Sequence, residues 1–403
     1  MAIDTRARKE RALLVGISRD GRRGARLPAA VSGGADQANA FSVASAPGDG
    51  LAELALLTQT AGGEVVGRLR QRRESLRPST FLSSGKLEEL KTLIASAEAD
   101  VVVFDDDLSP IQARNLEKEI DRKIIDRTEL ILDIFARRAR THEAQLQVEL
   151  AQLEYLLPRL TKMWAHLSRL GGGIGTRGPG ETQLEVDRRR VRHRIALLKR
   201  RLEGIERERE VQQRRRREMY RASLVGYTNA GKSTLFNALT HAGVLEEDML
   251  FATLDTTTRR LAFPGGDVML LSDTVGFIRK LPHHLVASFR ATLREVREAD
   301  LLIHVVDAAQ PEFPAQMAAV DEVLEELLDG RPVEQIVVLS KIDLLNETEC
   351  AALRVQHPHA ALLSARDPRL VEALRAKLLE RVREDRESRG RPAAREESSG
   401  GDE

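Results

Sequence analysis

The sequence predicts an α/β protein: a doubly wound, mostly parallel sheet in the C-terminal half, preceded by a small parallel α/β subdomain and a long helical hairpin. Three observations predict this fold class. Strand and helix patterns alternate over residues 51–138 and again over 220–383, as in parallel sheets covered by helices. Between these regions, residues 141–219 carry apolar residues at helical spacing. A glycine-rich loop that starts at Gly226 joins a predicted strand to a predicted helix.

The composition excludes several classes of protein. The 403 residues hold 63 Lys and Arg against 62 Asp and Glu, so the chain as a whole is neither basic nor acidic. The one cysteine, Cys350, excludes a disulfide framework and fits a reducing compartment. No apolar run reaches the roughly 20 residues that a membrane-spanning helix needs, and the first residues do not resemble a signal peptide. We therefore expect a cytoplasmic protein without a membrane span, and a monomer.

The N-terminal α/β subdomain is predicted over residues 11–140, after a flexible start at 1–10. The strand-like segment ALLVGI precedes residues 18–50, whose Gly, Ala and Ser content predicts a flexible insertion. The strands EVVGRL, DVVVFD and KIID then alternate with the helices SGKLEELKTLIASA and SPIQARNLEKEI. A purely structural role is the simplest interpretation of this core.

Residues 141–219 are predicted to form the helical hairpin. One leucine seam runs up to Pro158, and a second seam steps by 4, 3, 4 and 3 after the glycine-rich stretch GGGIGTRGPGET. The seam residues are Leu146, Leu150, Leu153 and Leu157, then Val191, Ile195, Leu198, Leu202 and Ile205. Residues 187–218 contain 14 Lys and Arg against 6 Asp and Glu, an excess of 8 positive charges. Such a helix is either a solvated surface or a surface that contacts nucleic-acid phosphates.

The loop GYTNAGKS fits the P-loop pattern and lies between the predicted strand YRASLVG and the predicted helix KSTLFNAL. In this pattern backbone N–H groups wrap the phosphates, Lys232 bridges the outer phosphates and the Ser233 hydroxyl binds Mg²⁺. A bare glycine turn is the alternative. The loop residues expected to bind nucleotide are Gly226, Tyr227, Thr228, Asn229, Ala230, Gly231, Lys232, Ser233 and Thr234.

Three later motifs follow in the order expected for a guanine-nucleotide site. In DTVG, Asp273 can hold Mg²⁺ through a water, and the Gly276 N–H can sense the terminal phosphate. In SKID, Asp343 would accept two hydrogen bonds from guanine, and SAR could place N–H groups at the guanine carbonyl. Together they predict a P-loop GTPase domain over 220–383, followed by a disordered tail at 384–403. The motif residues expected at the nucleotide are Asp273, Thr274, Val275, Gly276, Ser340, Lys341, Ile342, Asp343, Ser364, Ala365 and Arg366.

The stretch LFATLDTTTRR is expected to act as a switch loop that orders on the γ-phosphate. We expect Thr253, with Thr257 second, to reach Mg²⁺ and this phosphate; an ordinary strand and turn is the alternative. The loop residues expected at the nucleotide are Phe251, Ala252, Thr253, Leu254 and Asp255. Phe277 stands where signalling GTPases place a water-orienting glutamine, so intrinsic hydrolysis should be slow. Either a partner completes hydrolysis or a K⁺ ion near Asn229 does; the catalytic candidates are Asn229, Thr253 and Gly276.

At this point the sequence resembles the HflX family of translational GTPases over roughly Arg11 to Leu379. The resemblance rests on FDDDLSPIQARNLE, GGIGTRGPGETQLEVDRRR, GYTNAGKSTLFNAL, LFATLDTTTR and DTVGFIRKLPHHLVASFRATL. It implies Ser233 and Thr253 as Mg²⁺ ligands, GTP as substrate, and binding to the large ribosomal subunit and its ribosomal RNA, with splitting of stalled ribosomes under stress. We expect RNA contact through the hairpin, at Arg177, Arg188, Arg189 and Arg190.

Three residues depart from the family pattern: Ser340 stands where asparagine is usual, Thr256 where proline is usual and Ser83 where glycine is usual. Serine is shorter than asparagine, so we expect Ser340 to weaken guanine selectivity and the connection to the P-loop. A dual ATP/GTP RNA-remodelling NTPase is therefore the first alternative function. A non-catalytic scaffold stabilised by nucleotide is the second.

Overall fold

The computed structural model describes residues 9–18, 51–72, 77–160, 183–213, 219–241, 243, 249–280 and 293–389. The chain divides into two compact units, Met1–Ile134 and Phe135–Glu403. The predicted fold class is confirmed, because both units contain α/β sheets and the sheet of the second unit is mostly parallel.

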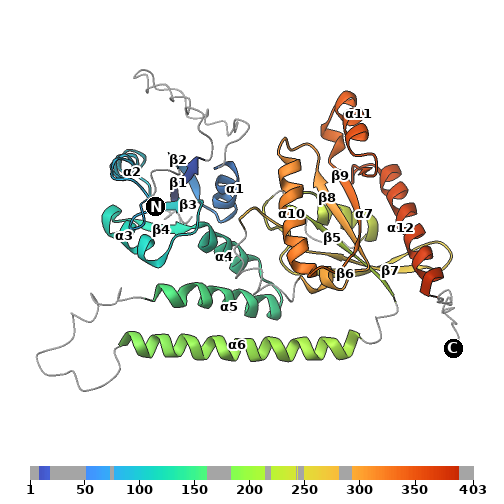
Figure 1. Cartoon of the computed structure of the whole chain (residues 1–403), viewed down its shortest axis with the longest axis horizontal. Coiled ribbons are helices and arrows are strands. Elements are labelled where there is room, and N and C mark those ends of the chain that lie inside the picture. The colour runs from blue at the N-terminus through green and yellow to red at the C-terminus, as the bar shows by residue number, and fades with distance from the viewer. Residues whose placement is uncertain are drawn as a thin grey trace, which may run out of the picture. The chain divides into compact units, whose positions relative to one another are not determined.

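The first unit contains a four-stranded parallel sheet of order β2-β1-β3-β4 (Figure 1). Its strands are β1 (Arg11–Ser18), β2 (Glu64–Arg72), β3 (Val101–Phe104) and β4 (Lys123–Asp126), and its helices are α1 (Ala52–Thr60), α2 (Ser84–Ala97) and α3 (Pro110–Ile120). Leu13, Leu90, Phe104 and Leu116 belong to one buried cluster, so α2 and α3 share a core with the sheet. The helix α4 (Arg127–Arg138) crosses into the second unit.

The second unit contains a six-stranded sheet of order β10-β9-β8-β5-β7-β6. Its strands are β5 (Tyr220–Gly226), β6 (Thr257–Ala262), β7 (Val268–Asp273), β8 (Leu301–Asp307), β9 (Glu334–Ser340) and β10 (Ala361–Leu362). All pairs are parallel except β6 with β7. The helix α10 (Phe313–Leu328) covers one face, and α7 (Lys232–Thr240) and α12 (Pro368–Arg389) cover the other (Figure 1). The same part of the chain also contains α9 (Arg294–Arg297), η4 (Ile342–Leu344) and α11 (Glu347–Gln356).

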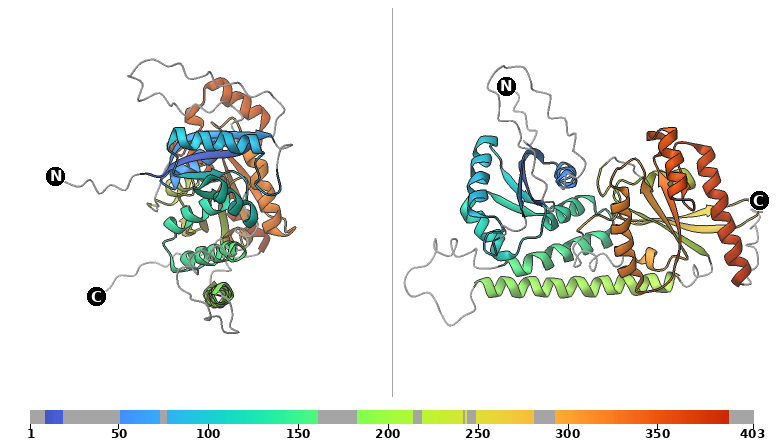
Figure 2. Two further views of the ribbon diagram at one scale, coloured as in Figure 1. Left: turned by 90° about the vertical axis from the view of Figure 1, so that its left-hand side faces the viewer. Right: turned by 45° about the horizontal axis from the view of Figure 1, so that its top comes forward.

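The predicted hairpin helices are α5 (His142–Arg159) and α6 (Gln183–Gln213), which run side by side (Figures 1 and 2). Leu146, Leu150 and Leu198 form a buried cluster between them, because leucines at heptad spacing share one face of each helix. Leu153, Ile195, Leu202 and Ile205 pack against this cluster as partly buried side chains. Pro158 lies in the last turn of α5, which ends one residue later.

The tail expected to be disordered from Glu384 is helical as far as Arg389, which corrects that prediction. The physical reason lies outside the local sequence: Arg383 and Arg386 both form ion pairs with the buried carboxylate of Asp267. The rest of the tail, insertion residues 19–50, the glycine-rich stretch with Arg177, and residues 281–292 lie outside the described residues.

Candidate nucleotide site and basic hairpin

The P-loop connects β5 to α7 at the carboxyl end of the sheet. Gly226 has φ of 149°, and a Cβ added there would lie 2.1 Å from the Val305 carbonyl oxygen, so only glycine fits beside β8. Gly231 has φ of 91° and is the N-cap of α7. The loop therefore turns its backbone toward the space in front of the α7 N-terminus, where the helix dipole favours an anion.

Lys232 is the first residue of α7, directly after the loop, and its side chain is buried. Its Nζ donates to the carbonyl oxygens of Tyr227 at 2.7 Å and of Gly226 at 3.2 Å. Burial lowers the pKa of Lys232 from 10.5 to about 8, and the charge of Asp273 opposes this shift. A phosphate would offer this ammonium a stronger acceptor than two neutral carbonyl groups.

Three oxygen-bearing side chains meet next to Lys232. Ser233 Oγ donates to Asp273 Oδ2 at 2.7 Å and lies 2.8 Å from Thr253 Oγ1, whereas Thr253 Oγ1 donates to Asp273 Oδ2 at 3.4 Å. Burial raises the pKa of Asp273, and the hydrogen bond from Ser233 opposes this. Within the described residues, Asp273 Oδ1 is buried and has no hydrogen-bond partner. Two hydroxyl groups beside a buried carboxylate fit Mg²⁺, which prefers oxygen ligands and commonly takes the rest from phosphates and water.

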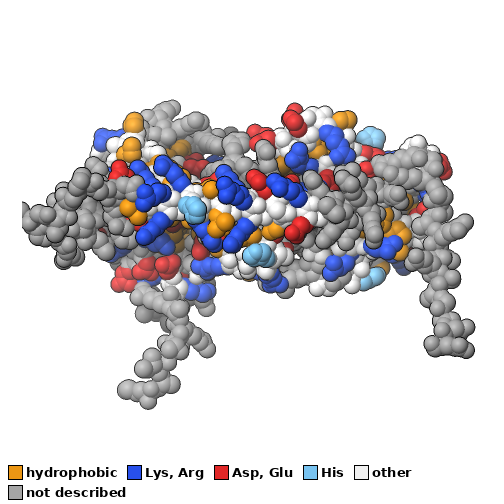
Figure 3. Space-filling model, turned by 90° about the horizontal axis from the view of Figure 1, so that it is seen from below, with side chains coloured by type: hydrophobic (Ala, Val, Ile, Leu, Met, Phe, Trp, Pro, Cys, Tyr) orange, Lys and Arg blue, Asp and Glu red, His pale blue; other side chains and the backbone are white. Residues whose placement is uncertain are grey.

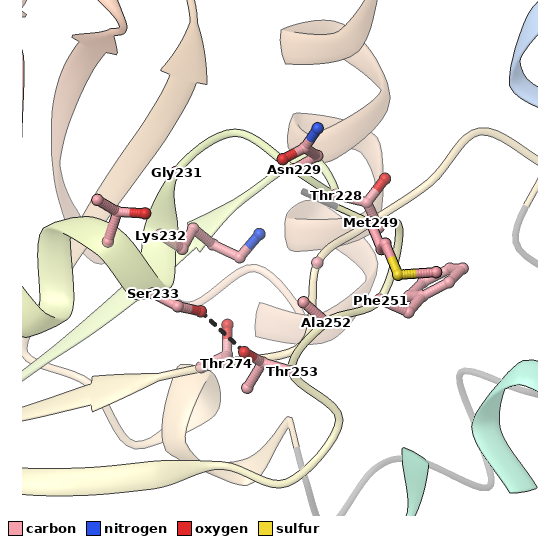
Figure 4. Close-up of a pocket in the computed structure, with 12 residues that line it drawn as sticks. Thr228, Asn229, Gly231, Lys232, Ser233, Met249, Phe251, Ala252, Thr253 and Thr274 are labelled. Atoms are coloured by element: carbon pink, nitrogen blue, oxygen red, sulfur yellow. Dashed lines mark hydrogen bonds between the residues drawn. The ribbon is translucent and has the colours of Figure 1, made fainter. Parts of the chain in front are cut away.

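Lys232, Ser233 and Thr253 line one hollow between the P-loop and the loop at residues 249–256 (Figure 4). Of the two threonines expected to reach the metal, Thr253 lines the hollow, whereas Thr257 is the first residue of β6. Met249 also lines it and was missed by the sequence analysis, although it stands two residues before Phe251. The lining residues are Thr228, Asn229, Gly231, Lys232, Ser233, Thr234, Met249, Phe251, Ala252, Thr253, Thr274 and Gly276.

The DTVG motif closes the hollow from the β7 side. A Cβ added to Gly276 would lie 2.7 Å from Thr228 Cα and 2.9 Å from Lys232 Nζ, so only glycine lets the backbone come this close. Phe277 is 1% exposed. Its N–H donates to the Gly226 carbonyl at 3.0 Å, and its carbonyl accepts from the Thr228 N–H at 2.8 Å. Phe277 thus ties DTVG to the P-loop and directs its side chain into the core.

The expected base-recognition residues begin with Ser340, the last residue of β9, and continue in the segments after β9 and β10. The Ser340 hydroxyl lies within donating distance of the Ala230 carbonyl, at 2.7 Å, and of the Val306 carbonyl, at 2.9 Å. The expected loss of the connection between residue 340 and the P-loop is therefore wrong, because this hydroxyl reaches the P-loop backbone directly.

Some of the remaining motif residues lie in the segments expected to recognise the guanine base, and others are buried in the core. Lys341 Nζ binds the Asn229 carbonyl oxygen and Asp307 Oδ2, each at 2.9 Å. Arg366 Nη1 lies 3.8 Å from Asp343 Oδ2. Ile342 is the first residue of η4, and the Ser364 hydroxyl accepts from the Arg366 N–H at 3.3 Å. The side chains of Val275, Leu254 and Ser364 are buried. The phenolic oxygen of Tyr227 accepts a hydrogen bond from the Arg279 N–H. Ala365 lies in the turn after β10.

Asp255 lies away from the hollow. Its carboxylate instead accepts hydrogen bonds from the start of α5, from the Arg140 N–H, the Thr141 N–H and the Thr141 hydroxyl. The sequence analysis predicted Asp255 as a nucleotide contact as part of the switch stretch from Phe251 to Asp255.

The exposed surface of α6 is strongly basic (Figure 3). Some cations are paired with α5: Arg194 binds both carboxylate oxygens of Glu149, at 2.6 and 2.8 Å, and Lys199 lies 2.8 Å from Glu154. Of the predicted RNA contacts, Arg188 donates to the Leu160 carbonyl at 2.9 Å, whereas Arg189 and Arg190 are exposed. Among the α6 side chains whose exposure the structure describes, the exposed cations are Arg189, Arg190, Arg192, Lys199, Arg200, Arg201 and Arg207.

Comparisons with known proteins agree with this geometry. Three family models match: "GTP-binding GTPase N-terminal" over residues 48–136, "GTP-binding GTPase Middle Region" over 138–216 and "50S ribosome-binding GTPase" over 221–341. The chain is 54% identical over 295 residues to the GTPase HflX of Lacrimispora saccharolytica, covering 73% of this chain and 70% of that protein. It is 48% identical over 336 residues to the GTPase HflX of Escherichia coli, covering 81% and 79%.

Among solved structures, a GTP-binding protein from the archaeon Sulfolobus solfataricus in complex with GDP is similar, at 23% identity and a TM-score of 0.43, covering 93% of this chain and 99% of that one. Among the helices that the structure describes, none combines the length and apolar character of a membrane span.

Proposed function

Because this chain belongs to the HflX family of GTPases, we propose that it uses GTP to control binding to the large ribosomal subunit and to split or rescue stalled ribosomes under stress. The observation that carries the proposal is a nucleotide site and a strongly basic hairpin in one unit. Because the proposed partner is the ribosome, we expect the protein to act in the cytoplasm. We also expect it to be a monomer.

In the proposed cycle, Lys232 exchanges its bonds to the loop carbonyls for the outer phosphates of GTP. Ser233 and Thr253 would hold Mg²⁺ directly, and Asp273 would hold it through water, in keeping with its buried Oδ1, which has no hydrogen-bond partner among the described residues. The ion would neutralise charge on the phosphates. The Gly276 N–H would sense the terminal phosphate, so loss of that phosphate would release both Gly276 and Thr253.

In this proposal, the group that positions the attacking water for hydrolysis comes from outside this set of residues. Phe277 has no group that could orient a water, and its side chain is buried. We propose that contact with the ribosome completes the arrangement that positions water. A K⁺ ion near Asn229 is the second candidate, because the Asn229 side chain lies at the rim of the hollow in which the phosphates are expected to bind (Figure 4).

The hairpin supplies the RNA contact in this proposal. Its cations lie along one helix, so they can follow a phosphate backbone, and aromatic residues make up only 3% of the chain, which favours electrostatic contact over stacking. Arg189 and Arg190 are better placed than Arg188, whose guanidinium binds the end of α5. Arg177, at the glycine-rich tip, remains a predicted contact.

The test measures GTP turnover alone and with purified large ribosomal subunits, in potassium and in sodium buffers. We expect strong stimulation by subunits; potassium dependence would assign the cation to Asn229. No stimulation in either salt would contradict the ribosome as activating partner.

A second test measures subunit binding over a range of salt concentrations. Replacing Arg188, Arg189 and Arg190 by Gln should weaken binding and reduce the salt slope by about 2 to 3, roughly one unit per lost phosphate contact. The control replaces three exposed cations on α11 and α12, namely Arg354, Arg369 and Lys377. An equal effect of both triple variants would show that net charge, not the hairpin, drives binding.

A dual ATP/GTP NTPase remains the alternative, because Ser340 directs its hydroxyl into the protein and adds no contact to the base. Competition between ATP and GTP distinguishes the two functions, since comparable affinities would refute guanine selectivity.

A further inference from the structure

The loop at residues 249–256 carries Thr253 and is contacted by the segment 135–141, which comprises the last turn of α4 and the three residues before α5. The Phe135 and Phe251 rings meet edge to face, with centroids 4.7 Å apart and planes at 82°. Arg138 Nη2 lies 3.5 Å from Met249 Sδ. Both contacted residues, Met249 and Phe251, line the phosphate hollow (Figure 4). One wall of the candidate nucleotide site is therefore packed against the segment 135–141, which precedes α5.

Asp255 makes the closest connection between the two segments. Its Oδ1 accepts from the Thr141 hydroxyl at 2.6 Å, and its Oδ2 accepts from the N–H groups of Arg140 at 2.9 Å and Thr141 at 3.3 Å. Thr141 is the N-cap of α5, and its Oγ accepts from the Ala144 N–H at 3.2 Å. A carboxylate at this position also interacts favourably with the positive end of the helix dipole.

The conformation of the loop needs support from outside itself. Phe251 has φ of 55°, in the left-handed region, which is unfavourable for a residue with a bulky side chain. The residue is nonetheless 2% exposed and held against Phe135. Because Thr253 lies between Phe251 and Asp255, contacts from the 135–141 segment flank it on both sides.

We propose that Asp255 is a positioning residue that places Thr253 at the magnesium and γ-phosphate site by anchoring the loop on Thr141, the N-cap of α5, and on the preceding residue, Arg140. The inference rests on the proposed role of Thr253. Through this carboxylate, GTP binding and the hairpin affect each other. When the γ-phosphate orders Thr253, the N-terminus of α5 becomes more ordered, and an ordered α5 N-terminus in turn increases the affinity for GTP. This reciprocity is required for any coupling between two binding equilibria.

A purely structural role for Asp255, as an additional cap of α5, predicts something different. Loss of a cap lowers stability and affects GTP and GDP equally. Loss of a positioning residue weakens binding of the triphosphate alone, because Thr253 meets a phosphate only in GTP. The ratio of the two affinities therefore separates the roles.

The experiment measures affinities for a non-hydrolysable GTP analogue and for GDP in the full chain. Asp255→Ala should weaken analogue binding about tenfold, equivalent to about 1.4 kcal/mol, and leave GDP binding within about twofold. Thr141→Ala should show the same selectivity with a smaller loss, and the double variant should bind no worse than Asp255→Ala, since both remove one connection. Ser109→Ala, which removes the N-cap hydroxyl of α3, is the matched control and should leave both affinities unchanged.

Hydrogen exchange supplies a second readout. The amides of the first turn of α5 should exchange more slowly with the GTP analogue than with GDP, and this difference should vanish in Asp255→Ala. Equal losses for analogue and GDP, additive effects in the double variant, or a persistent exchange difference would overturn the inference. Thr253→Ala is the reference variant. If Thr253→Ala loses affinity for the GTP analogue selectively and Asp255→Ala does not, the anchoring role of Asp255 is refuted and the proposed metal site stands. If Thr253→Ala shows no selective loss of affinity for the analogue, the proposed metal site is refuted, and the inference about Asp255 is refuted with it.

Discussion

Replacing Phe277 by glutamine should leave the basal rate of GTP hydrolysis unchanged and destabilise the protein. In a GTPase whose side chain at this position faces the phosphate, glutamine would orient the attacking water. Here the side chain is 1% exposed, and the residue's backbone N–H and carbonyl are both bonded to the P-loop strand and loop, so residue 277 cannot turn without breaking this pairing. Glutamine would therefore be buried rather than catalytic.

The size of the effect follows from the same burial. Removing a phenylalanine side chain from a core costs about 3–5 kcal/mol, and a buried amide without a partner costs about 1–3 kcal/mol. Glutamine keeps part of the volume, so we expect a loss of about 3–4 kcal/mol in the free energy of unfolding. Chemical denaturation measures this, and single-turnover hydrolysis at saturating GTP measures the rate. Phe277→Leu, which stays apolar, is the control with a loss of about 1.5 kcal/mol. A rate increase of about tenfold in the Gln variant, absent from the Leu variant, would refute the reasoning.

Two further predictions follow from buried charges. Lys232→Ala should abolish nucleotide binding and leave the circular dichroism spectrum unchanged, because Lys232 is the cation that the α7 N-terminus presents to the phosphates; unchanged GTP affinity would refute the P-loop assignment. Asp267→Ala should lower the free energy of unfolding by about 2 kcal/mol and increase proteolysis within the last turns of α12, because it leaves Arg383 and Arg386 without their shared carboxylate. An unchanged midpoint of thermal unfolding would contradict it.

The features that the sequence predicted correctly are those encoded in short spacings. The P-loop, DTVG and the leucine seams each depend on residues a few positions apart, so their partners are fixed by helix and strand geometry alone. Ser83 carried a similar local signal. It was noted only as an unexplained departure, yet serine before a helix is a preferred N-cap, and its side chain accepts from the Lys86 N–H at the start of α2.

The features that the sequence did not predict depend on partners far apart in the chain. Asp255 meets Thr141, and Asp267 meets Arg383 and Arg386, across separations of 114 to 119 residues. Such pairs follow from how helices dock on a sheet, which no local pattern specifies. The tail prediction failed for this reason: a polar stretch without apolar periodicity gives no sign that a buried carboxylate elsewhere will order it.

Guanine selectivity should depend on Asp343 and not on Ser340. A serine hydroxyl has one proton to donate, and at Ser340 it is directed to the Ala230 and Val306 carbonyls inside the protein, so it holds the P-loop without touching a base. Ser340→Ala should therefore weaken GTP and ATP binding by the same factor, about fivefold for one lost hydrogen bond of about 1 kcal/mol.

Asp343→Asn should instead weaken GTP about a hundredfold or more and leave ATP unchanged, because a carboxylate that accepts two guanine N–H bonds contributes about 1.5–3 kcal/mol with each. The comparison needs only competition binding with both nucleotides on the two variants. A change in the GTP-to-ATP ratio on Ser340→Ala would mean that residue 340 reaches the base after all, and no change on Asp343→Asn would remove the basis for calling this a guanine site. If both expected results are obtained, guanine selectivity resides in Asp343, a side chain different from the one that holds the P-loop. The serine at position 340 is then compatible with a strict GTPase.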